Sequence, residues 1–232
     1  LIAGVRYESF DLQTSDFVAA FDAQRKDTKW SPRFGVILKP IEAVSIYGSY
    51  SQSFLPQSGD QFSVLNATSV SLEPEEFENF EIGAKWAIQP ELLLTAALFR
   101  LERSNSTAPD PGNPGFVIQT GETRVEGFEL SLAGDILSNL HVNLGYTYLD
   151  GEVTSETSSA LPGTRLEQLP EHQIGAWARY DISRRLGLGA GIVHQSEQFA
   201  SLSNAVVLPA YTRVDAAVFF DVTQQLALQL NV

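Results

Sequence analysis

The chain has 232 residues, of which 44% are hydrophobic and 10% aromatic, and this apolar content is too high for a disordered polypeptide. The formal charge of −13 excludes nucleic acid as a partner, because an acidic surface releases no counterions from a phosphate backbone. No apolar run approaches the roughly 20 residues that a membrane-spanning helix needs. The absence of Cys excludes disulfides and thiolate chemistry.

Apolar residues recur at every second position rather than at helical spacing, which predicts β-strands. Between residues 80 and 88 every even position is apolar, whereas the odd positions include Glu81 and Lys85. The same alternation returns in 174–182 and again in 214–220. Each predicted strand therefore has one apolar and one polar face, as in a sheet that separates two different surroundings.

In chain order, the alternation predicts strands at 1–12, 30–39, 43–53, 77–88, 91–103, 115–133, 139–150, 170–182, 186–198, 211–221 and 225–232. Tight connectors are expected at 39–42, 89–91, 134–138, 183–185 and 222–224, and long polar ones at 13–29, 54–76, 104–114, 151–169 and 199–210. Short and long connectors thus alternate. This is typical of an antiparallel up-and-down transmembrane β-barrel of the outer membrane, whose turns are short on the periplasmic side and whose loops are long outside.

Eleven strands are an odd number, and closed bacterial barrels normally have an even one. The sequence also has no Met, shows no signal peptide and ends at Val232 within the last predicted strand. We therefore expect this chain to be part of a barrel, with further chain after Val232 and before Leu1.

Two further features predict which side chains of the sheet face lipid and which face the lumen. An aromatic girdle at a lipid interface is expected from residues near strand ends, namely Tyr47, Tyr50, Trp86, Tyr146, Tyr148, Tyr180 and Tyr211. Lumen-facing charges that pair with one another are expected at Arg124, Glu126, Arg213 and Asp215. The alternative is a soluble β-sandwich whose apolar faces pack together in water, although strands this long are unusual in sandwiches.

A series of short motifs in a fixed order then carries a resemblance over essentially the whole chain. The motifs are LIAGVRY at 1–7, WSPRFG at 30–35, SIYGSYSQSF at 45–54, LEPE at 72–75, EIGAK at 81–85, GETRVEGFEL at 121–130, GYTYLD at 145–150, LPEH at 169–172 and LPAYTRVD at 208–215. Together they resemble the C-terminal part of the barrel of TonB-dependent siderophore receptors.

The resemblance implies that residues 1–232 are part of a single barrel domain of about twenty-two strands, with the plug domain absent from this chain. It implies an outer-membrane receptor of a Gram-negative bacterium that imports a ferric siderophore, with energy from the TonB-ExbB-ExbD complex acting through the plug. Further partners would be outer-membrane lipid and lipopolysaccharide. Iron would be carried as a chelate substrate, so no resident cofactor and no protein-bound metal site are expected.

Ligand contacts are expected from aromatic and basic side chains at the outer strand ends and in the loops, where they would stack on or pair with an anionic chelate. The candidates are Tyr50, Phe54, Gln57, Phe62, Arg103, Phe116, His172, His194 and Phe199. The alternatives are a passive porin, an adhesin or scaffold, and a TonB-dependent transporter for haem, cobalamin or an oligosaccharide. Catalytic residues are not expected, because the sequence has no Gly-x-Ser-x-Gly elbow, no His-rich metal spacing and no phosphate-binding glycine loop.

Overall fold

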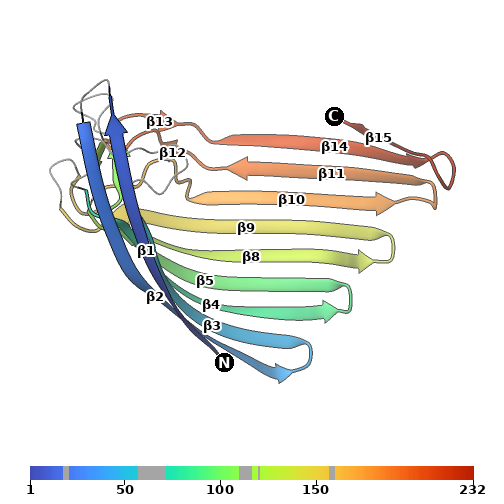
Figure 1. Ribbon diagram of the computed structural model, residues 1–232. Coiled ribbons are helices and arrows are strands. Elements are labelled where there is room, and N and C mark those ends of the chain that lie inside the picture. Colours follow the sequence, from blue (N-terminus) through green and yellow to red (C-terminus); the bar gives the residue numbers. More distant parts are fainter. Residues whose placement is uncertain (18–20, 57–71, 110–116, 120, 157–159) are drawn as a thin grey trace.

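The computed structural model describes residues 1–17, 21–56, 72–109, 117–119, 121–156 and 160–232. Within these residues, eleven strands form one sheet in which each strand pairs antiparallel with the next, so the predicted meander is confirmed. Figure 1 shows this sheet as a curved wall, open along its first and last strands. No helix in the described part of the chain is both long and apolar enough to cross a membrane.

The wall consists of β1 (Ile2–Asp16), β2 (Phe21–Ile41), β3 (Val44–Leu55), β4 (Glu75–Gln89), β5 (Leu92–Ser104), β8 (Thr123–Leu137), β9 (Leu140–Val153), β10 (His172–Asp181), β11 (Leu186–Gln195), β14 (Tyr211–Asp221) and β15 (Ala227–Asn231). The connectors hold two small hairpin sheets, β6 (Thr107–Pro109) with β7 (Val117–Gln119), and β12 (Gln198–Phe199) with β13 (Val207–Leu208). Tight turns join β2 to β3, β4 to β5, β8 to β9, β10 to β11 and β14 to β15, and all of them lie at one end of the wall (Figure 1).

Two sequence predictions about the connectors are wrong. Residues 13–29 are not a long loop, because β1 and β2 stay in register as far as Asp16 opposite Phe21. Figure 1 shows this extension projecting beyond the other strands. Its strands pair through the backbone, and because its residues are mostly polar they give no apolar alternation. The predicted strand 115–133 is interrupted, because Gly121 has a φ of 72° and β8 begins only at Thr123. A positive φ breaks the extended conformation, and glycine adopts it at little cost.

The two faces of the wall differ as the alternation predicts. On one face the large apolar side chains are exposed, as shown by Ile82 at 58% and Leu98 at 61% of their maximal exposure. In the described residues no second sheet covers this face. An apolar surface of this extent is what a bilayer, rather than water, would cover. We call it the outer face.

The opposite, inner face carries polar side chains and bulky rings that lie over glycine. A Cβ atom added at Gly189 or at Gly191 would come within 2.5 Å of the indole ring of Trp177, which crosses above both positions from β10. Glycine at these two positions lets the large ring lie flat against the wall. Close approach of the ring to the backbone therefore accounts for glycine at both positions.

Candidate ligand-binding site

Aromatic rings form a belt on the outer face that runs from β1 to β10. Centroids are 4.7 Å apart for Tyr7 and Trp30, 6.5 Å for Phe34 and Tyr50, 4.7 Å for Tyr50 and Phe80, 5.3 Å for Phe128 and Tyr146, and 5.3 Å for Tyr148 and His172. Phe34, Tyr50 and Phe80 share one register row, whereas Phe128, Tyr148 and His172 share the next row toward the tight turns. This is expected when strands tilt, because a level plane then crosses the rows obliquely.

Three of the predicted ligand contacts lie on this outer face. Tyr50 stacks between rings of the belt, and the Tyr146 hydroxyl and His172 Nδ1 are 2.9 Å apart. His194 Nδ1 lies 2.8 Å from the hydroxyl oxygen of Thr212. The wall separates these side chains from the inner face, so we do not carry Tyr50, His172 and His194 forward into the proposed site.

The predicted orientation is wrong for two girdle residues and for two of the charges. Tyr47 lies on the inner face, where its hydroxyl donates to Glu81. Tyr211 pairs with Gln195 and also faces inward, since the outward positions of β14 are the even ones. Arg124, Glu126 and Phe128 occupy alternate positions of β8, so all three side chains face outward. All four departures follow from the parity of positions along the strand, since a shift of one residue places a side chain on the other face.

The predicted pairing of these charges is nevertheless present. On the outer face Arg124 donates to Glu152 over 2.6 Å, and Arg100 donates to Glu126 over 2.6 Å. Arg213 and Asp215, two residues apart on β14, are joined over 3.0 Å. These pairs are largely exposed, and such pairs typically contribute less than about 1 kcal/mol each.

A groove of about 420 Å³ lies on the inner face of β3, β4, β5 and β8. Its lining is polar and aromatic, and consists of Ser51, Ser53, Phe77, Asn79, Glu81, Phe99, Leu101 and Glu129. The volume lies within the range of small-molecule sites. Rings and hydroxyl groups therefore share one concave surface on the side of the wall that faces the lumen.

Arg103 continues this surface toward the long connectors, and its guanidinium group is already engaged. Its Nη2 and Nε donate to Glu75 Oε2 over 2.6 and 3.2 Å, and its Cζ lies 5.3 Å from the ring centroid of Phe77. Glu75 is only 5% exposed, and a buried carboxylate requires such a partner. The Arg103 side chain remains 39% exposed, so it can meet a second anion at the end of the groove.

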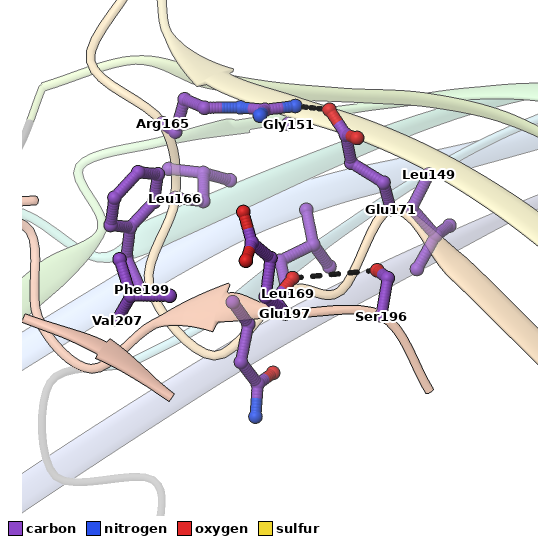
Figure 2. A pocket seen from close by; sticks show the side chains of 11 residues that line it. Leu149, Gly151, Arg165, Leu166, Leu169, Glu171, Ser196, Glu197, Phe199 and Val207 are labelled. Atoms are coloured by element: carbon purple, nitrogen blue, oxygen red, sulfur yellow. Dashed lines mark hydrogen bonds and ion pairs between the residues drawn. The ribbon is translucent and has the colours of Figure 1, made fainter. Parts of the chain in front are cut away.

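Phe199 lies elsewhere, in a cavity of about 70 Å³ between the end of β9 and the connectors that follow β9 and β11. Figure 2 shows Leu149, Leu166 and Phe199 around this cavity, with the ion pair of Arg165 and Glu171 beside it. The space is far below the volume of a usual ligand pocket. Phe199 therefore packs loops together in the structure.

The remaining predicted residues divide into two groups. The ring of Phe54 contacts Phe10 of β1 edge-on, with centroids 5.7 Å apart. Gln57, Phe62 and Phe116 lie outside the described residues. Of the six candidates within the described residues, only Arg103 lies beside the groove, in contact with the lining residue Phe77. The structure adds Phe77 and Phe99, which strand parity could have identified, because both are large rings at positions opposite in phase to Phe80 and Leu98.

The antiparallel sheet, its apolar outer face and its polar inner face define the class of protein. The chain is part of the wall of an outer-membrane-type β-barrel, with one side facing lipid and the other facing the lumen. The family model of the TonB dependent receptor-like β-barrel matches residues 1–232. The chain therefore belongs to the TonB-dependent receptor family, whose barrels are those of Gram-negative outer-membrane proteins.

Relatives and solved structures agree with this assignment. The siderophore receptor PiuA of Acinetobacter baumannii is 32% identical over 249 aligned positions, which cover 99% of this chain and 33% of PiuA. The catecholate siderophore receptor Fiu of Escherichia coli K12 is 30% identical and is matched over 93% of this chain and 30% of its own length. The crystal structure of PiuA superposes with a TM-score of 0.83, covering 99% of this chain and 35% of that one. The chain thus spans about a third of these relatives.

Proposed function

We propose that this chain is the wall of an outer-membrane receptor that binds a ferric siderophore and imports it with energy coupled through TonB. Membership of the family and the likeness to siderophore receptors support the proposal. One observation connects it to particular residues: in the inner-face groove the ring of Phe77 lies 5.3 Å from Arg103 Cζ.

The charges along the groove favour one end of it. Arg103 would attract the anionic oxygens of a ferric chelate, and the ring of Phe77 beside it would stack on a flat catecholate or hydroxamate group. Glu81 and Glu129 line the same groove and would repel an anion. The chelate would therefore be held beside Arg103, at the end nearest the long connectors.

Other parts of the mechanism would lie outside this chain. Residues 1–232 would form part of one barrel domain, and the plug and its contact with the TonB-ExbB-ExbD complex would be supplied by other segments of the receptor. Iron would enter as substrate within its chelate, and the outer face would contact lipid and lipopolysaccharide. No feature of the described residues favours passive diffusion, adhesion or a haem, cobalamin or oligosaccharide ligand over this proposal.

Growth of a deletion strain on a panel of ferric catecholates and hydroxamates tests the proposed transport. Loss of growth on one chelate, with the others still used, is expected. Complementation with the full-length receptor carrying Phe77→Ala should weaken binding of that chelate roughly tenfold. Phe80→Ala, which removes a ring of the same strand on the outer face, is the matched control and should bind as the unaltered receptor does. Unchanged growth of the deletion strain on every chelate would refute the proposal.

A further inference from the structure

The connector after β9 folds inward and packs against the inner face of the wall. A Cβ atom added at Gly151 would lie 2.2 Å from Leu169 Cδ2 and 3.2 Å from Leu166 Cδ1. The amide of Leu166 also donates to the Gly151 carbonyl over 3.0 Å. Gly151 thus lets this connector lie directly on β9. We call the described residues of the two connectors, 154–156, 160–171 and 196–210, the lip.

The second connector forms hydrogen bonds to the backbone of the first connector. The side-chain amide of Asn204 donates to the carbonyl of Arg165 over 2.9 Å and accepts from the amide of the same residue over 3.1 Å. Gln168 donates its amide to the Phe199 carbonyl over 2.9 Å. These bonds join the two connectors as a strand pair would.

A small apolar core fills the space between the connectors. Val153 is fully buried, and Ala160 and Leu202 are 7% and 3% exposed, with Leu166 packed against them. The amide of Leu202 donates to Glu167 Oε2 over 3.0 Å, so the buried backbone is also satisfied. Surface loops usually open easily, because they have few buried apolar contacts and solvent-exposed hydrogen bonds. The lip differs from such loops in its small buried core, while the bonds of the Asn204 clamp lie at the surface.

We propose that the lip is one preassembled folding unit and forms a fixed wall of the receptor's mouth, which neither opens nor closes when ligand enters. The first half of this statement concerns the chain alone, and the second half rests on the proposed receptor function. Both connectors are held by a shared core and by reciprocal hydrogen bonds, so disturbing one should loosen the other.

Hydrogen exchange of the full-length receptor without ligand tests the folding unit. Amides of Leu166, Gln168 and Leu202 should exchange as slowly as strand amides. Asn204 has a φ of 54°, so Asn204→Gly keeps the backbone conformation while it removes the clamp. It should speed exchange roughly tenfold in both connectors together. Exchange of these amides at unprotected rates, or a change confined to residues 196–210, would overturn the proposal.

A matched control separates the clamp from a general effect of glycine. Asn105 also has a positive φ, of 57°, and its side chain donates to the Pro74 carbonyl over 3.1 Å, away from the lip. Asn105→Gly should leave exchange in the lip unchanged. If it loosens the lip as much as Asn204→Gly does, the connectors are not a separate unit and the proposal fails.

A reversible cross-link tests the fixed wall. Glu152 and Arg165 form an isolated bridge between β9 and the first connector, and the chain has no Cys of its own. A disulfide between them would tie the lip to the wall and keep the Asn204 clamp, which uses only the backbone of residue 165. The double variant Glu152→Cys with Arg165→Cys should bind and import the chelate identified by the growth assay equally well when oxidised and when reduced. Loss of import on oxidation, with recovery on reduction, would show that the lip must move. Failure to find any imported chelate would count against the proposed function and leave the exchange result standing.

Discussion

Arginine substitutions at two adjacent positions of β10 should have very different costs. Ala176 faces outward at the middle of the strand, between Leu144 and Ile192 on the neighbouring strands. Gly175 faces inward, and a Cβ atom added there would have no neighbour within 4 Å. Arginine facing lipid at the bilayer midplane costs about 2–4 kcal/mol, whereas a lumen-facing position accepts a charge at little cost.

Ala176→Arg should therefore destabilise the full-length receptor by about 3 kcal/mol relative to Gly175→Arg, which is a factor of more than roughly one hundred in the folding equilibrium. Reversible urea unfolding in phospholipid vesicles measures this difference, and the amount of folded receptor in the outer membrane gives an independent check. Equal stability of the two variants, or greater damage from Gly175→Arg, would refute the assignment of the two faces.

Three smaller perturbations test local packing through the same unfolding measurement and through hydrogen exchange. Gly134→Ala should destabilise by roughly 2 kcal/mol or more, because Gly134 has a φ of 127° and its added Cβ would lie 1.8 Å from a backbone carbonyl oxygen; unchanged stability would contradict this. Gly189→Ala should cost about 1–3 kcal/mol by displacing the indole of Trp177, and Trp177→Ala in the same variant should recover part of that loss. Asn204→Gly should cost roughly 1–2 kcal/mol of local stability through its two bonds to Arg165, and equal exchange in variant and parent would rule this out.

The sheet could be predicted from the sequence because each strand lies between two different environments. Because the two faces meet different surroundings, apolar and polar residues alternate in strands such as β4 and β10. The tight turns show where the chain reverses direction. The polar extension of β1 and β2 could not be found in this way. Its residues are mostly polar on both faces, and even the buried Asp27 is a charged residue paired with Arg25, so no apolar alternation identifies it.

The site was less accessible to prediction, for two separate reasons. The two-residue period alone predicts Tyr50, His172 and His194 on the outer face and Phe77 and Phe99 on the inner face, because all five lie within or beside the alternating strands. The lip was not predictable, because its contacts join residues of two connectors that have no periodicity. Such contacts depend on the three-dimensional positions of the strand ends and not on any local pattern.

The most direct test of the account is a scan of single spin labels along residues 128–133 of β8 in the full-length receptor, which is simplified because this chain lacks Cys. Labels at Phe128, Leu130 and Leu132 should be more accessible to dissolved oxygen in lipid than to a water-soluble nickel chelate. Labels at Glu129, Ser131 and Ala133 should lose that preference for oxygen. If the even positions are shielded from both reagents, the apolar face is packed against protein and the wall does not face lipid.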